Sequence, residues 1–174
     1  MEKYFDRLEK EPLIAERWKK IEELESYGIK PFGKKYDKQI MIGDILKHNP
    51  EENLKFKTAG RIMSLRGKGK VYFAHIEDQS GKIQIYIKKD ELGEEQFDHI
   101  VKMLNVGDII GIEGELFITH TEELTLRVKS IALLTKNVRS LPEKYHGLTD
   151  VEIRYRKRYV DLIMNEDSKE TFIL

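Results

Sequence analysis

Residues 82–88 read Lys-Ile-Gln-Ile-Tyr-Ile-Lys, and this stretch decides the fold. Isoleucine occupies positions 83, 85 and 87, and the residues between them are polar or amphipathic. Side chains of a β-strand point alternately to opposite faces, so this period of two predicts a strand with one buried face. The isoleucines must face the interior, and Gln84 is therefore predicted to point outward.

Other strand patterns surround this one. The sequence predicts strands at 56–65, 71–78, 108–119 and 124–134, with a helix at 90–104 between the third and fourth strands. A parallel α/β protein would alternate strand and helix throughout, and this chain does not. Three strands, a helix and two strands form the order of a five-stranded OB-fold Greek-key barrel, which we predict over residues 55–135. A generic α+β sheet is the alternative.

Helices are expected on both sides of the barrel. In the N-terminal extension, residues 1–54, a helix begins near Pro12 and ends near Gly28, and residues 41–47 form a short second helix. Residues 136–174 are expected to be a linker and a hinge helix. That helix starts at Thr149, which has capping-box spacing to Glu152. The apolar stripes of the two main helices are Ile14, Trp18, Ile21 and Leu24, and Val151, Tyr155, Tyr159, Leu162 and Ile163.

Composition excludes several classes of protein. The 174 residues include 31 Lys and Arg against 31 Asp and Glu, so any basic groove has to be local. Without cysteine there is no disulfide and no thiolate metal site. The N-terminus lacks an apolar stretch of signal-peptide length, and no apolar run is long enough to span a membrane. We therefore expect a cytoplasmic location and no membrane partner.

Motifs for catalysis or metal binding are not found. The run Gly67-Lys68-Gly69-Lys70 continues into a strand, so it is a hairpin turn and not a phosphate-binding loop. No two of the five histidines have the spacing of metal ligands. We expect neither a catalytic residue nor a metal site nor a bound cofactor in these residues.

The candidate binding residues lie on the second and third strands. OB barrels bind single strands of nucleic acid across one face with aromatic rings and polar side chains. An outward Gln84 offers a donor and an acceptor to a base edge, and uracil presents the complementary N3–H and carbonyl. Phe73 is a stacking ring if it points outward. Both sides of its strand are partly apolar, so the sequence leaves its direction open.

Charged residues flank this pair. Arg61, Arg66, Lys68 and Lys70 cluster on the first strand and its turn, where they either meet phosphates or a base or form a solvated basic hairpin. Glu123 lies in the turn between the last two strands. By its residue type alone, Glu123 is a surface carboxylate.

Several short motifs are distributed along the chain. They are residues 59–63, 69–73, 78–86, 106–108, 116–119, 123–124, 141–150 and 154–163. In these motifs the sequence resembles the N-terminal anticodon-binding domain of bacterial-type class II lysyl-tRNA synthetases. The resemblance covers essentially the whole chain and is most specific in the segment that leaves the barrel.

This resemblance implies roles for four residues. Phe73 and Gln84 match an eleven-residue spacing with which the family reads the middle uridine of the anticodon. Arg66 and Glu123 complete the set. The family usually has glycine before that glutamate, and Glu122 stands there instead, which puts the conformation of the hairpin in question.

The resemblance also implies a larger protein. The full-length relative is a homodimer that joins lysine to tRNA(Lys) using ATP and Mg²⁺ in a later catalytic domain. The chain ends where the first motif of that domain would begin. We therefore expect this fragment to bind the anticodon loop of tRNA(Lys) without catalysis, and its last helix to contact the catalytic domain. An aspartyl- or asparaginyl-type module and a stand-alone single-strand-binding OB protein are the alternatives.

Overall fold

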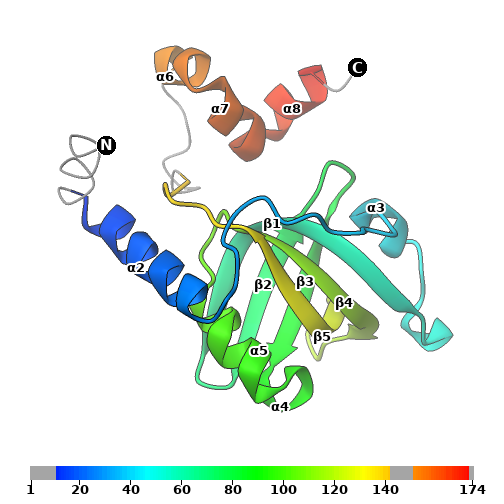
Figure 1. Cartoon of the computed structure of the whole chain (residues 1–174). Coiled ribbons are helices and arrows are strands. Elements are labelled where there is room, and N and C mark those ends of the chain that lie inside the picture. Colours follow the sequence, from blue (N-terminus) through cyan, green and yellow to red (C-terminus); the bar gives the residue numbers. More distant parts are fainter. Residues whose placement is uncertain (1–10, 142–150, 173–174) are drawn as a thin grey trace. The chain divides into compact units, whose positions relative to one another are not determined.

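The computed structural model describes residues 11–141 and 151–172, which divide into two compact units on either side of the Val138–Arg139 bond. The first unit is a closed five-stranded barrel with helices around it (Figure 1). Its strands are β1 (Lys55–Lys68), β2 (Val71–Glu77), β3 (Lys82–Lys88), β4 (Ile109–Ile118) and β5 (Leu124–Thr135).

The barrel closes in the order β1-β2-β3-β5-β4, with β4 returning to β1. The β3–β5 pair is parallel and the other described pairs are antiparallel. The core is built from the alternating apolar residues that the sequence predicted, and Ile83, Ile85 and Ile87 are at most 2% exposed. The predicted OB architecture is thus confirmed. The first strand is longer than expected and runs on to Lys68, which leaves Gly69 and Lys70 as the turn.

The predicted helix at 90–104 is wrong as a single element. The structure has α4 (Lys89–Leu92), α5 (Glu94–His99) and a 3-10 helix, η2 (Val101–Met103), in its place. Gly93 separates the first two with φ of +95°, a backbone conformation that helical residues do not adopt. Helices α4 and α5 lie at one end of the barrel (Figure 1). The apolar period continues across the break, since Leu92, Phe97 and Val101 are all buried.

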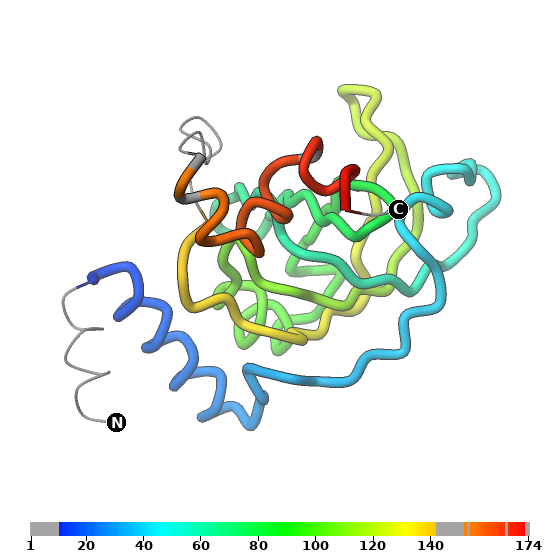
Figure 2. Tube along the Cα trace, turned by 90° about the horizontal axis from the view of Figure 1, so that it is seen from above, coloured from blue at the N-terminus to red at the C-terminus, as the bar shows by residue number. Residues whose placement is uncertain are grey.

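The N-terminal extension packs against the barrel through its apolar stripe. Helix α2 (Pro12–Ser26) buries Ile14, Ile21 and Leu24 as predicted, and it also buries Arg17. Residues 27–41 then run along the outside of the barrel (Figure 2) to α3 (Ile42–Ile45), followed by η1 (Pro50–Glu52). Backbone hydrogen bonds hold this segment on the strands. The N–H of Lys34 donates to the Leu134 carbonyl, and the N–H of Gln39 donates to the Lys57 carbonyl.

The second unit contains three short helices where the sequence predicted one. These are α6 (Val151–Arg156), α7 (Arg158–Met164) and α8 (Glu166–Phe172). Buried Asp161 joins them, because its carboxylate accepts hydrogen bonds from Arg154, Arg158 and Asn165. Tyr155 and Tyr159 of the predicted apolar stripe are 70% and 62% exposed. Thr149 of the predicted capping box lies outside the described residues.

Candidate nucleic-acid interface

Phe73 lies on the outside of the barrel. Ala74 and Ile76 of the same strand are buried in the core, so alternation directs Phe73 and His75 to the outer face. The Phe73 ring is half-buried because it packs on Tyr86, with 5.0 Å between the ring centroids. The question that the sequence left open is thereby answered in favour of an accessible aromatic ring.

Strand register brings residues from all five strands into two rows across this face. In each row, neighbouring residues are Cα partners on adjacent strands. One row is Arg66, Phe73, Tyr86 and Arg127, and the other is Ser64, His75, Gln84, Thr125 and Phe117. We call the two rows together the outer face.

Gln84 lies on this face as predicted, yet only 3% of it is exposed because neighbouring side chains cover it. Its Oε1 accepts a hydrogen bond from Arg66 Nη2 at 3.2 Å, and its Nε2 donates one to Thr125 Oγ1 at 3.0 Å. A carboxamide has two N–H donors and two acceptor lone pairs. One N–H of Nε2 and one lone pair of Oε1 thus remain beyond these two bonds.

Glu123 reaches the same face through the β4–β5 hairpin. Its Oε1 is 2.9 Å from Nε2 of His75, and the Nδ1 of His75 is 2.9 Å from the hydroxyl of Ser64. A carboxylate only accepts, so His75 donates to Glu123. Glu122, where the related family has glycine, takes a left-handed φ of +60°. The hairpin therefore keeps a turn that glycine would adopt with less strain.

The four predicted basic residues separate into two groups. Arg66, Lys68 and Lys70 are exposed at one end of the β1–β2 pair, next to Phe73. Arg61 is at the other end of β1, beyond a bulge between Ile62 and Ser64, and its Nη1 donates to the Gly107 carbonyl at 2.9 Å. Burial lowers the pKa of Arg61, and Asp108 partly opposes this shift. The structure thus does not bring Arg61 to the other three.

Sequence reasoning missed several residues of the outer face. Tyr86 packs edge-on against Phe117 at 5.8 Å, which extends the aromatic line from Phe73, and the Arg127 guanidinium lies 4.7 Å over the Phe117 ring. Phe117 and Arg127 also line a pocket of about 440 Å³ with residues 49–51. Parity with Gln84 could have identified Tyr86. Phe117 and Arg127 depend on register between distant strands.

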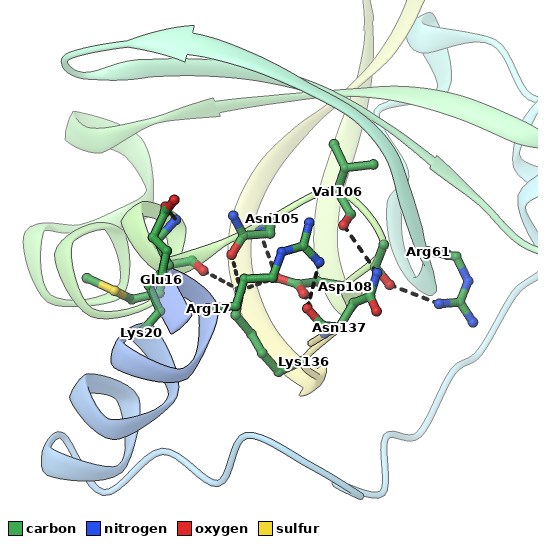
Figure 3. A network of polar contacts seen from close by, with 11 residues as sticks. Glu16, Arg17, Lys20, Arg61, Asn105, Val106, Asp108, Lys136 and Asn137 are labelled. Carbon is green, nitrogen blue, oxygen red and sulfur yellow. Dashed lines mark hydrogen bonds and ion pairs between the residues drawn. The ribbon is translucent and has the colours of Figure 1, made fainter. Parts of the chain in front are cut away.

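A second polar cluster is buried away from the outer face, where α2 meets the ends of β4 and β5 (Figure 3). Lys136 and Asp108 form an ion pair, and both side chains are 0% exposed. Lys136 Nζ also donates to the Met103 carbonyl and to Asn105 Oδ1. The Asp108 carboxylate accepts from the backbone N–H groups of Asn105 and Asn137. Burial lowers the pKa of Lys136, and Asp108 opposes this shift.

Other chemical features of the described ranges are limited. Among residues 11–141 and 151–172, no three His, Asp or Glu side chains gather as a metal site would require. In the same ranges, no helix has both the length and the apolar character needed to cross a membrane.

Comparison with known proteins gives a domain family and close relatives. Residues 56–134 match the model of the OB-fold nucleic acid binding domain. The chain is 96% identical over 173 residues to a lysine–tRNA ligase of Fusobacterium nucleatum, covering 99% of the chain and 35% of the relative. It is 46% identical to a lysine–tRNA ligase of Staphylococcus haemolyticus, covering 90% of the chain and 34% of the relative.

These matches confirm the resemblance that the sequence motifs indicated. A lysine–tRNA ligase of Staphylococcus saprophyticus is 48% identical over 167 residues. In each case the matching part spans about a third of the length of the curated relative.

Proposed function

Because the chain has the OB barrel and the N-terminal sequence of the lysyl-tRNA synthetase family, we propose that its outer face binds the anticodon loop of tRNA(Lys). The observation that carries this proposal is the juxtaposition of Phe73 and Gln84. The accessible Phe73 ring on β2 is a diagonal neighbour of Gln84 on β3, because the Cα partner of Gln84 is two residues from Phe73. The Gln84 carboxamide retains one donor and one acceptor. This is the combination that grips an unstacked base by its face and its edge.

The middle uridine of the anticodon is the base that we assign to this pair. Uracil presents N3–H, which the spare lone pair of Gln84 Oε1 accepts. It also presents a carbonyl, which the spare Nε2–H of Gln84 reaches. The ring of Phe73 stacks on the base. A bidentate pair of this kind contributes about 1–3 kcal/mol of discrimination against a wrong base.

Phosphate contacts come from the exposed basic residues beside this pair. Arg66, Lys68 and Lys70 lie at the same end of the β1–β2 pair as Phe73, where the RNA backbone would pass. Their contacts to phosphates supply attraction that depends on salt and carries no sequence information. The chain has no net positive charge, so this local cluster supplies the positive charge that attracts the RNA backbone.

Glu123 contributes differently from the basic residues. A carboxylate repels phosphates, so it is useful only as an acceptor from the N–H group of a base. Its bond to His75 uses one oxygen, which leaves the other for a base that flanks the middle uridine.

Catalysis belongs to the whole protein in this proposal. The relatives are named lysine–tRNA ligase, and the chain spans about a third of their length. We propose that the whole protein is a cytoplasmic homodimer that ligates lysine to tRNA(Lys) with ATP and Mg²⁺, while residues 11–141 supply anticodon binding. The exposed Tyr155 and Tyr159 are then the surface that contacts the catalytic domain.

Binding of anticodon stem-loops tests the proposal. A lysine stem-loop is compared with one whose middle U is changed to C, and the first should bind about 10-fold to 100-fold more tightly. Phe73→Ala should weaken binding of the first by about 1–3 kcal/mol. Phe32→Ala is the control, because it removes another exposed ring from residues 27–41. Equal affinity for the two RNAs would contradict the proposal.

The same measurements separate the alternatives. An aspartyl- or asparaginyl-type module shares the middle uridine and would differ in its response to changes of the flanking anticodon bases. A general single-strand binder would bind poly-pyrimidine DNA with a steep dependence on salt and little dependence on sequence.

A further inference from the structure

Thr125 is a buried polar residue that contacts the proposed uridine-binding amide from another strand. It is 0% exposed and lies on β5, directly opposite Gln84 in the parallel β3–β5 pair. Its hydroxyl donates to the Glu123 carbonyl at 3.1 Å and accepts from Gln84 Nε2 at 3.0 Å. With its proton directed to Glu123, the Thr125 oxygen presents only lone pairs to Gln84.

The other side of the Gln84 amide is held with the opposite polarity. Arg66 carries only N–H donors, and its Nη2 lies 3.2 Å from Gln84 Oε1. The amide is therefore fixed at both ends, with an acceptor next to Nε2 and a donor next to Oε1. A rotation by 180° would bring NH₂ against the guanidinium and the amide oxygen against the Thr125 lone pairs.

This orientation has a consequence for the choice of base. A glutamine that rotates freely can match uracil in one orientation and cytosine in the other, because cytosine presents an acceptor at N3 and a donor at N4. A glutamine that is held in one orientation matches uracil alone. We propose that Thr125 is a positioning residue that prevents Gln84 from rotating, and so makes the outer face select uridine over cytidine at the middle position of the anticodon.

The β4–β5 hairpin extends this control. Thr125 donates to the backbone of Glu123, the residue whose carboxylate is held by His75. Thr119 contacts Glu123 as well. Its backbone N–H donates to the Glu123 carbonyl, and its Oγ1 accepts a hydrogen bond from the Glu123 N–H. The direction of the Thr125 proton thus depends on the hydrogen bonds that hold the β4–β5 hairpin together. The conformation of this hairpin is thereby coupled to the choice of base at Gln84.

This inference rests on the proposed anticodon binding, and the test uses the whole chain and the same two stem-loops. In Thr125→Val, a substitution of nearly equal volume, the preference for U over C should fall from 10-fold or more to about threefold or less. The fall should come mainly from tighter binding of the C-containing RNA. Thr125→Ser retains the hydroxyl and should keep the preference of the native chain.

Controls separate positioning from general damage. Thermal unfolding of Thr125→Val shows whether the barrel is intact, and the salt dependence of binding should not change because no phosphate contact is lost. Arg66→Ala alters an exposed residue, and it should also lower the U-over-C preference while weakening both RNAs. This second variant tests whether a fixed orientation of the Gln84 amide sets the preference, even where the valine variant does not fold.

The outcomes are distinct for the two claims. If Thr125→Val folds and binds the stem-loops with an undiminished U-over-C preference, the role of Thr125 is overturned and anticodon binding stands. If Thr125→Val does not fold, an undiminished preference in Arg66→Ala overturns the role in the same way. A native chain that does not distinguish the two RNAs overturns the middle-uridine assignment and this inference together. Loss of preference in the valine variant with rescue in the serine variant supports both.

Discussion

Two polar clusters of the barrel differ in what their hydrogen bonds leave over. At Lys136 and Asp108, every N–H of the ammonium group is used and the carboxylate accepts from three donors, and both of these side chains are 0% exposed. At Gln84, two protein bonds orient the amide and leave one donor and one acceptor. The first cluster holds parts of the chain together, and in the proposed function the second presents its remaining donor and acceptor to a base.

The difference indicates how to distinguish structural from functional polar groups in a barrel. Burial alone does not separate them, because Gln84 is 3% exposed and Lys136 is 2% exposed. The two kinds of polar group are better separated by whether donors and acceptors remain unused next to an accessible aromatic ring. A completed network contributes to stability, whereas an incomplete one that is rigidly held contributes to recognition.

The largest effect is expected from breaking the completed cluster. Lys136→Met leaves the Asp108 carboxylate buried without its counter-charge, which should lower the free energy of unfolding by about 3–5 kcal/mol. Urea unfolding measures this change. Adding Asp108→Asn should recover part of the loss, and the preference for U over C in the folded variant should match that of the native chain. A loss below about 1 kcal/mol would show that the pair does not hold α2 and the strand ends together.

Asp78, another carboxylate with several hydrogen bonds within the chain, tests the comparison through the pH dependence of stability. Burial alone would raise its pKa, but bonds from the Ile42 N–H, Lys38 and Ser80 outweigh burial and lower it to about 2. Because this pKa lies below the ordinary value of an aspartate, the contribution is complete above about pH 4 and is lost as pH falls toward 2.

The expected size of this contribution is about 2 kcal/mol. Stability should therefore decrease between pH 4 and 2 in urea titrations of the native chain. Asp78→Asn should remove about that amount at pH 7 and flatten the acid part of the profile. Parallel profiles for the native chain and the variant would disprove the assignment.

Truncation of the incomplete cluster should affect stability less. Gln84→Ala removes two hydrogen bonds to neutral or exposed partners, and we expect a loss of about 1 kcal/mol in the free energy of unfolding. The contrast with Lys136→Met is the sharpest form of the comparison, since both side chains are almost fully buried. Equal losses for the two variants would remove the distinction between them.

The smallest effect concerns the hairpin that carries Glu123. Glu122→Gly replaces a left-handed residue with the one that adopts this conformation most easily, and it should raise stability by about 0.5–1 kcal/mol. Glu122→Ala is the matched control because it removes the same charge and keeps the strain. A stabilisation of similar size in both variants would assign the effect to charge.

The strands and their buried faces were predictable because they depend on local alternation. Residues 82–88 have a period of two that matches the barrel interior, and the sequence boundaries of β3 agree with the structure. The helix between β3 and β4 was predicted too long because Gly93 looks tolerable in an apolar period and only its φ of +95° breaks the helix. The C-terminal helix was likewise predicted as one piece where the described residues form three.

The candidate site was predictable only in part. Gln84 followed from alternation, and Arg66, Lys68 and Lys70 from their clustering before a turn. Phe73 could not be oriented because both faces of its strand carry apolar residues. The predicted grouping of Arg61 with the other basic residues was wrong. Arg61 lies toward the other end of β1, beyond the bulge between Ile62 and Ser64.

The sequence by itself determined which segments form strands, which face of each strand is buried, and that an amide and a basic turn lie on the outside. The tertiary structure alone decided that Thr125, 41 residues from Gln84 along the chain, holds the amide in one orientation, and that His75 holds Glu123 beside it. The physical reason is that alternation is a property of a single strand. The register between strands is set by closure of the whole barrel, which joins segments that share no local pattern.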